Sequence, residues 1–140
     1  IGGARIDFAS PAELEAAGFD TRPMWVLPDR VWSAMSTRIA DGTRLNQAGS
    51  PTQAGVIGGA RIDFASPAEL EAAGFDTRPM WVLPDRVWNG MSTTIADGTL
   101  IRTPVATTVW KIVNGRRVVT TETGTVWIVA QRVADAIPLG

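Results

Sequence analysis

The sequence predicts an α+β protein, mainly antiparallel β, built as a tandem repeat of modules that each contain a β-hairpin. Three observations lead to this prediction. Residues 1–43 recur at residues 57–99 with only three differences. Each copy carries a two-residue turn between strand-like runs, and the first two copies have a short stretch with helix-start and helix-stop residues. Each module is therefore expected to run β-β-β-α-β plus one helical turn.

A third, diverged copy follows the first two. Ile112–Val118 align with Val56–Ile62 at the same offset of 56 residues, whereas the alignment of Val126–Val133 with Met80–Val87 requires a loss of ten residues. Periodicity on this scale is typical of arrays in which each unit buries its apolar side against a neighbour. The predicted units are a partial first repeat (residues 1–40), a full second repeat (residues 41–96) and a shortened third repeat (residues 97–140).

The hairpin prediction depends on the turn residues. Thr99–Thr103 predicts a short strand, and Asn114-Gly115 lies between two further β-rich runs. Asn-Gly favours a type I′ turn because both residues tolerate positive φ. Gly58-Gly59 and Gly2-Gly3 occupy the equivalent turn in the other repeats, where glycine adopts the same conformation at no steric cost.

A short helix is predicted after the hairpin. Ser66 is suited to the N-cap, Pro67 to the first helical position, and Glu69 completes a capping box three residues after Ser66. Gly74 ends the helix, and Phe75 is expected to fold back as the apolar contact that follows a C-cap. The first repeat has the same residues at Ser10, Pro11, Glu13, Gly18 and Phe19.

The rest of the module completes the sheet and defines its faces. Met80–Leu83 predicts a strand, and Pro84 begins one more helical turn. Alternation along the hairpin places Ile57, Ala60, Ile62 and Phe64 on the core side of the second repeat, with Arg61 and Asp63 pointing the other way. The same register in the third repeat predicts an outer face of Trp110, Ile112, Arg117 and Val119, which can bury against another surface.

Composition excludes several classes of function. The net charge is −1 with no run of like charges, which argues against nucleic acid or an anionic membrane surface as partner. No apolar run approaches the roughly 20 residues of a membrane span. Because the chain has no Cys and no His, it has neither a thiol nucleophile nor an imidazole for catalysis or metal binding. We therefore expect a protein that is not an enzyme and needs no cofactor.

Carboxylates provide no clear alternative. Asp41 and Asp97 begin two Asp-Gly-Thr triplets, but too few oxygen ligands surround them for calcium, so each predicts a turn in which Asp caps its own backbone. Glu69 with Asp85, and the equivalent pair in the first repeat, could serve glycoside hydrolysis. Glu69 is already explained by helix capping, so we do not predict a catalytic role.

Tryptophan is the first candidate for ligand contact. Trp25, Trp81 and Trp127 are equivalent in the three repeats, and we expect them in the core because small modules need large side chains to bury enough surface. The other three are candidates for stacking on sugar rings, with burial in the core as the alternative. They are Trp32, Trp88 and Trp110.

Arginine is the second candidate. One set recurs beside the hairpin turn (Arg5, Arg61 and Arg117), and another follows the Met-Trp-Val-Leu strand (Arg30, Arg86 and Arg132). Such a ladder could bind carboxylates or phosphates of a polymer. The alternatives are salt bridges between modules, for instance with Asp7 or Asp63, and arginine stems that cover aromatic rings. The predicted ligand-binding residues are Trp32, Trp88, Trp110, Arg5, Arg61, Arg117, Arg30 and Arg86.

The order of these motifs resembles a bacterial repeat of roughly 50 residues. The matching residues are Asp97–Arg102, Val109-Trp110, Asn114–Arg117 and the helix from Ser66-Pro67 to Gly74-Phe75. That repeat occurs in secreted and cell-surface proteins of actinobacteria and other bacteria, often beside cell-wall or carbohydrate-active enzymes. The resemblance implies an extracellular location and a role in surface attachment or binding. Two features depart from it: Trp110 replaces the usual Tyr, and the third repeat lacks the helix.

Together these observations predict a non-catalytic extracellular repeat module, a structural or adhesive array that binds cell-wall polysaccharide or another glycan. One alternative is a purely structural spacer, or a self-assembling filament or oligomer subunit whose repeats contact only one another. Another is a set of β-propeller-like blades from a lectin. The strand-like run Ile1–Phe8 would leave an open edge, which favours self-association.

Overall fold

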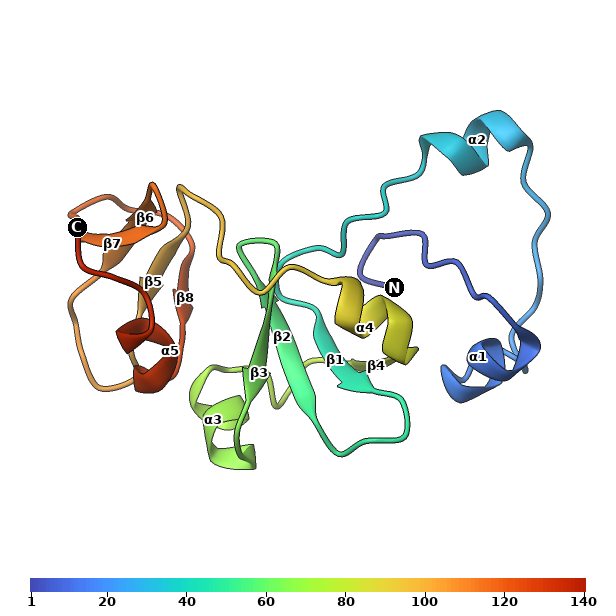
Figure 1. The fold of residues 1–140 in the computed structure, drawn as a ribbon, viewed down its shortest axis with the longest axis horizontal. Coiled ribbons are helices and arrows are strands. Elements are labelled where there is room, and N and C mark those ends of the chain that lie inside the picture. Colours follow the sequence, from blue (N-terminus) through green and yellow to red (C-terminus); the bar gives the residue numbers. More distant parts are fainter.

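A computed structural model describes residues 1–140 as a mixed α+β chain with two four-stranded sheets that do not close into a barrel. The first sheet contains β1 (Arg44–Gln47), β2 (Gln53–Ile57), β3 (Ala60–Phe64) and β4 (Met80–Leu83). The second contains β5 (Leu100–Arg102), β6 (Trp110–Val113), β7 (Arg116–Val119) and β8 (Val126–Ile128). The short helices are α1 (Pro11–Ala16), α2 (Asp29–Ala34), α3 (Pro67–Ala72), α4 (Asp85–Gly90) and α5 (Gln131–Asp135) (Figure 1).

The predicted hairpins are present, and their turns share one backbone conformation. The φ angles are 55° and 74° at Gly58-Gly59, and 52° and 74° at Asn114-Gly115. Gly2-Gly3 has 56° and 74°, although no strand flanks it. The prediction for Asp41 is corrected: its carboxylate accepts the N–H of Gly59 at 2.8 Å, so it caps the hairpin turn rather than its own backbone. Asp97 does the same for Gly115 at 3.0 Å.

Each sheet contains a parallel pair that the sequence did not predict. The strand orders are β3-β2-β1-β4 and β7-β6-β5-β8, in which β1 pairs parallel with β4, and β5 with β8. The other pairs are antiparallel, as expected. In the second repeat α3 lies in the crossover that returns the chain from β3 to β4 (Figure 1). The third repeat, which lost ten residues here, makes the same return without a helix.

The predicted capping boxes are confirmed in part: Ser66 caps the helix, but Glu69 accepts the N–H of Ala65, one residue before the N-cap, rather than that of Ser66. The Oγ of Ser66 accepts the N–H of Glu69 at 3.3 Å, and Oε1 of Glu69 accepts the N–H of Ala65 at 2.9 Å. Gly74 adopts a φ of 78°, and Phe75 is buried directly after the helix. The same hydrogen bonds surround α1, where Phe19 is half-buried. These helices are six residues long, so their end groups satisfy a large share of their unpaired backbone donors.

The core lies between the two sheets and between the first sheet and the first repeat. One cluster joins Ile57, Ala60 and Ile62 of the first sheet to Ile112 and Val129 of the third repeat. A second cluster packs the opposite face of the first sheet against α4 and the first repeat; it contains Ala4, Ile39, Leu45, Ala54, Val56, Leu83 and Trp88. Both faces of the first sheet are therefore buried.

The predicted faces of the third repeat are partly corrected. Ile112, assigned to the outer side, is buried against the second repeat, as the sequence allowed for that face. Val119, on the same side, is exposed. The alternation predicts an inner side of Lys111, Val113, Arg116 and Val118. This prediction is wrong, since Lys111 is half-buried and the other three are exposed because no further sheet packs there.

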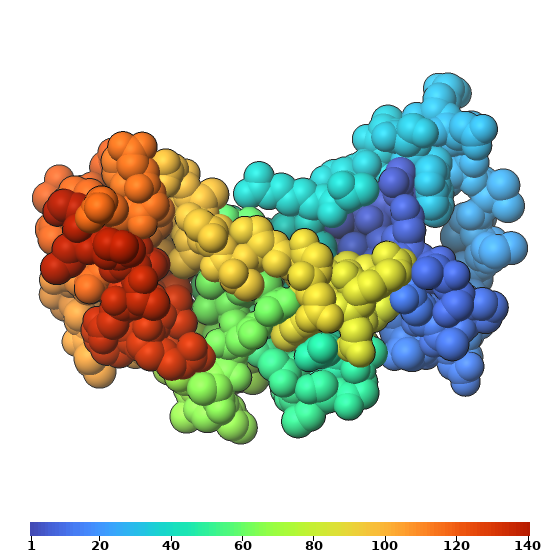
Figure 2. All heavy atoms as spheres, in the orientation of Figure 1, coloured from blue at the N-terminus to red at the C-terminus, as the bar shows by residue number.

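The first repeat has two helices and no strand. Its residues Met24–Leu27 have the same sequence as β4 but are irregular and exposed. Figure 2 shows the segment that carries α2 standing away from the body of the molecule. No helix anywhere in the chain has the length and apolarity needed to span a membrane.

Candidate functional site

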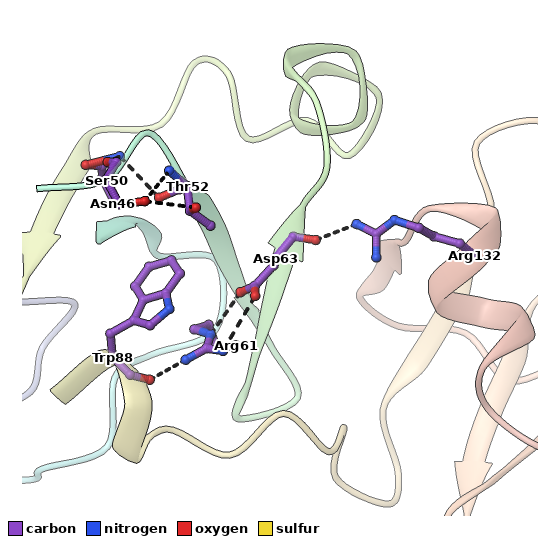
Figure 3. A network of polar contacts seen from close by, with 7 residues as sticks. All are labelled: Asn46, Ser50, Thr52, Arg61, Asp63, Trp88 and Arg132. Carbon is purple, nitrogen blue, oxygen red and sulfur yellow. Dashed lines mark hydrogen bonds and ion pairs between the residues drawn. The ribbon is translucent and has the colours of Figure 1, made fainter. Parts of the chain in front are cut away.

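Six of the eight predicted site residues form three arginine–tryptophan pairs. The guanidinium carbon lies 5.1 Å from the ring centre in Arg5–Trp32, 4.7 Å in Arg61–Trp88 and 5.0 Å in Arg117–Trp110. Arg61 also donates from Nη1 to the backbone oxygen of Trp88 (Figure 3). At these distances the ring face attracts the cation, and the arginine stem covers apolar surface.

Each of these arginines also has an acidic neighbour, and Nε of Arg117 donates to the backbone oxygen of Ile137. Nε of Arg61 lies 2.8 Å from Oδ1 of Asp63, and Nε of Arg5 lies 3.0 Å from Oδ1 of Asp7. Arg117 lies 3.8 Å from Asp135 instead. The Arg61 and Arg117 side chains are mostly buried, and their ion pairs lie within one repeat. The ring-covering alternative therefore describes them, whereas the salt bridge between modules does not.

The prediction that Trp88 stacks on a sugar is corrected by its burial. Trp88 is 2% exposed and lies in the cluster on the first sheet, so neither ring face is open to a ligand. Trp32 occupies the equivalent position in the first repeat and is 46% exposed. The difference arises because Trp88 packs on a four-stranded sheet, whereas the first repeat has no sheet to cover Trp32.

Trp110 reaches the same arginine position from a different element. Trp110 of β6 occupies the position that Ala54 of β2 holds in the second repeat. Ala134 of α5 occupies the position that Trp88 of α4 holds there. The two positions have exchanged sizes, so each of these two repeats keeps one tryptophan and one alanine there; Ala54, Trp88 and Ala134 are buried and Trp110 is partly buried. Sequence comparison of the repeats aligned these positions, but it could not show that they face each other.

Arg86 and Arg132 link neighbouring repeats. Arg86 Nη2 lies 2.9 Å from Oε1 of Glu13 and also donates to the backbone oxygen of Asp7. In the next junction Arg132 Nη2 lies 2.6 Å from Oε1 of Glu69. It also donates to the backbone oxygen of Asp63 at 2.7 Å, as Figure 3 shows. The sequence presents helix capping and pairing between modules as separate roles, but each glutamate performs both.

These contacts perturb the ionisation of the junction groups. The Arg132 hydrogen bond is the main cause that lowers the pKa of Glu69, with help from the N–H of Ala65, while partial burial opposes the shift. For Glu13 the N–H of Ala9 is the main cause of a lowered pKa, and Arg86 adds to it. Glu69 in turn raises the pKa of Arg132. Each carboxylate therefore stays ionised to lower pH than a free glutamate.

An aromatic contact accompanies each ion pair. Trp81 lies 6.0 Å from Phe19, and Trp127 lies 6.3 Å from Phe75, so each tryptophan meets a phenylalanine of the preceding repeat. Arg22 covers Trp81 at 5.4 Å, and the equivalent arginine of the second repeat, Arg78, covers Trp127 at 5.8 Å. Arg22 and Arg78 were not among the residues that the sequence predicted for the site. The only sequence feature that could have indicated them is that each follows the recurring phenylalanine, Phe19 or Phe75.

The first repeat leaves the equivalent residues uncovered. Trp25 is 84% exposed, although we expected it in the core with Trp81 and Trp127. Arg30, the eighth predicted site residue, is exposed and forms no hydrogen bond or ion pair within the chain, unlike Arg86. The core prediction for Trp25 is wrong here because the residues that would cover its ring are supplied by a preceding repeat in the other two cases.

Two equivalent grooves lie at the junctions. The groove between the second and third repeats has a volume of about 400 Å³ and includes Arg61, Asp63 and Arg132. The groove between the first and second repeats has a volume of about 370 Å³ and includes Arg5 and Arg86. No group of three acidic, His or Cys side chains is placed to hold a metal ion. The grooves therefore present arginine, aspartate and hydroxyl groups rather than a metal centre.

Comparisons with known proteins do not add a relative. No family model, no curated protein and no solved structure matches this chain.

Proposed function

We propose that this chain is a non-catalytic structural segment of an extracellular tandem-repeat array, in which each repeat is held in place by its neighbour. The observation that carries the proposal is the recurrence of one junction. A guanidinium of one repeat pairs with the capping glutamate of the preceding repeat at both junctions. A phenylalanine of the preceding repeat contacts a tryptophan of the next at the same two places.

The third repeat supports a directional array. It lacks the helix whose glutamate and phenylalanine receive the next repeat. Its outward face carries Arg116 where the second repeat has the buried Ala60. Val113 and Val118 are exposed on the same face, so Arg116 makes this face less apolar without making it fully polar. A more polar outer face is what a repeat array requires where no further unit covers it. The location at a bacterial surface rests on the motif resemblance alone.

Hydrogen exchange of matched variants tests the structural role. Arg132→Met removes the ion pair between repeats, and Lys111→Met removes an ion pair within the third repeat, where Lys111 Nζ lies 2.9 Å from Glu122. If the junction couples the repeats, Arg132→Met lowers amide protection in both sheets, whereas Lys111→Met lowers it only in the second sheet. Equal, purely local effects of both variants would reject the proposal.

Carbohydrate binding is a second candidate because the predicted arginines line the recurrent grooves. Arg61 contributes to one groove, and Arg5 and Arg86 to the other, so a polymer with regularly spaced hydroxyl or carboxyl groups could contact both. The test is retention on peptidoglycan and a glycan array. Arg86→Ala and Arg30→Ala form a matched pair, since Arg30 lines neither groove. Retention that no variant changes, or no retention at all, would leave only the structural role.

We do not propose a β-propeller. The strands of an up-and-down blade would be antiparallel throughout, but β4 and β8 pair parallel with their neighbours.

A further inference from the structure

We propose that the first repeat is an acceptor for a β-hairpin supplied from outside residues 1–140, and that this hairpin has the chemistry of residues 41–56. The acceptor surface is formed by Met24–Leu27, Trp32 and the run Gly2–Phe8. This acceptor role goes beyond the structural role proposed above and does not require it. The chain itself supplies the comparison, because the same residues occur once with such a hairpin and once without it.

The second repeat shows what this surface binds. Residues 57–96 differ from residues 1–40 at only three positions (Ser33/Asn89, Ala34/Gly90 and Arg38/Thr94), and none of these lies in a strand. In the second repeat the hairpin of β1 and β2 occupies the middle of the sheet. It pairs parallel with β4 on one side, from Arg44↔Met80 to Gln47↔Leu83, and antiparallel with β3 on the other.

The exposed fractions of equivalent side chains show that the first repeat lacks the cover that the β1–β2 hairpin gives the second. Leu83 is fully buried beneath the hairpin, whereas its counterpart Leu27 is 40% exposed. Trp88 and Trp32 differ in the same direction. Met24, Trp25 and Val26 add a continuous exposed apolar stretch in a strand-forming sequence. Surface of this kind is characteristic of sites that bind another chain, and a strand edge binds it by backbone pairing.

The rest of the acceptor is already in place. The turn at Gly2-Gly3 has the same φ angles as Gly58-Gly59, within one degree. Phe19 lies 5.7 Å from Phe8, as Phe75 lies 5.5 Å from Phe64. The helix α1 is capped as α3 is. Binding therefore needs ordering mainly of Met24–Leu27, which keeps its entropic cost low.

Charge complementarity specifies the occupant. In the second repeat the Asp41 carboxylate accepts the N–H of Gly59, and Arg44 Nη1 donates to the backbone oxygens of Asp76 at 3.0 Å and Arg78 at 3.3 Å. The equivalent groups of the first repeat are the N–H of Gly3 and the backbone oxygens of Asp20 and Arg22. The occupant thus carries an acidic residue before its first strand and an arginine at the start of that strand.

Two further features define the hairpin. Asn46 Nδ2 donates to the backbone oxygens of Ser50 and Thr52, and Ser50 Oγ donates to Thr52 Oγ1 at 3.0 Å, so the hairpin closes its own loop (Figure 3). Gly55 faces the Phe75 ring so closely that a Cβ there would lie 2.6 Å from Cε1. Since Phe19 is the counterpart of Phe75, the second strand of the occupant needs glycine at this position.

A synthetic peptide with the sequence of residues 41–56 tests the proposal on the full chain. We expect saturable 1:1 binding by calorimetry and slower hydrogen exchange at residues 24–27 when the peptide is present. A peptide with Gly55→Val is the matched control, and we expect it to bind at least about tenfold more weakly because its side chain meets Phe19.

Variants of the chain locate the site. Leu27→Asp places a charge on the acceptor surface and should weaken binding at least about tenfold. Val105→Asp makes the same kind of change at a residue that is 93% exposed outside that surface, and it should bind as the unmodified chain does. Circular dichroism of each free variant establishes that it is folded.

Three results would overturn the proposal. One is no binding of the peptide. Another is protection confined to residues 80–83, which would mean that the peptide only replaces the chain's own hairpin. The third is a dimer without peptide in which residues 24–27 are already protected, which would assign the surface to a second copy of this chain.

Discussion

The arginine of each Arg–Trp pair occupies an equivalent position in all three repeats, but the tryptophan does not. It comes from α2 and α4 in the first two repeats and from β6 in the third. What persists is the contact between one guanidinium and one indole beneath the helix. Because packing depends on total volume and shape, either backbone position can supply the ring.

Because the tryptophan and the alanine trade places between repeats, we expect the effects of Trp88→Ala and Ala54→Trp on the free energy of unfolding to be non-additive. Trp88→Ala should lower the free energy of unfolding by about 3–5 kcal/mol because it leaves a cavity. Ala54→Trp alone should cost about 1–3 kcal/mol through overpacking, since Ala54 is fully buried. The double variant reproduces the arrangement of Trp110 and Ala134, so it should be more stable than Trp88→Ala. Urea denaturation measures all three, and simple additivity of the two losses would contradict the interpretation.

Gly90 in α4 allows a second prediction at the scale of one residue. Gly90 in α4 has no positive φ and has open space where a Cβ would lie, and the first repeat has Ala34 there. Gly90→Ala should therefore raise the free energy of unfolding by about 0.5–1 kcal/mol, through reduced entropy of the unfolded chain. Thermal unfolding provides the measurement. A lower melting temperature would show that the helix needs glycine for another reason.

At the scale of elements, α3 connects local capping to the junction between repeats. Glu69 accepts the N–H of Ala65, just before the N-cap, and pairs with Arg132 of the third repeat. A six-residue helix has little stability of its own, so it depends on such end contacts and on packing. The helix and the junction therefore share one carboxylate.

This sharing predicts a pH dependence. The pKa of Glu69 is lower in the folded chain than its ordinary value of 4.5. The ionised carboxylate therefore stabilises the fold, and this stabilisation is complete at pH values above 4.5. The stabilisation is lost as pH falls through the lowered pKa, because protonation removes the pairing with Arg132. The stability difference between the unmodified chain and Glu69→Gln should be constant near neutral pH and shrink below about pH 4.5.

Urea denaturation between about pH 3 and about pH 7 checks this behaviour. Glu71→Gln on the same helix is the control, because its carboxylate forms no hydrogen bond or ion pair within the chain. A difference for Glu69→Gln that stays unchanged to the acid end of this range would mean that the carboxylate is not the stabilising form.

At the scale of the whole molecule, the sheets pack face to face along the chain. The first sheet is covered on both faces, and the second is covered on one. The uncovered side of the second sheet carries Arg116 in place of an alanine. The uncovered faces therefore differ: one carries Arg116 between exposed valines, and the other carries exposed Met24–Leu27.

Removal of the third repeat should expose the apolar face of the first sheet. A fragment of residues 1–96 loses the cover over Ile57, Ala60 and Ile62, and we expect it to self-associate in size-exclusion chromatography with light scattering. Ala60→Arg in the same fragment copies the third repeat and should increase the monomer fraction. A fragment that is monomeric without this change would contradict the proposed packing role.

Features set by neighbouring residues followed from the sequence. The turn at Asn114-Gly115 needs two residues that tolerate positive φ, and the cap of α3 needs Ser66 and Glu69 three residues apart. The sequence also indicated which arginines and tryptophans recur. It did not predict the parallel pairing of β1 with β4, because that register depends on how the crossover packs back on the sheet.

The segment Met-Trp-Val-Leu occurs at residues 24–27 and at residues 80–83, but it has a different structure at each place. This difference shows which features depend on local sequence and which depend on tertiary contacts. The sequence by itself determined the hairpin turns, the helix caps and the repeat, since these depend on contacts between residues close in the chain. Only the tertiary structure decided that residues 80–83 form a strand while residues 24–27 stay exposed. The physical reason is that strand pairing and burial need a partner surface, and in this chain only the later copy has β1 beside it.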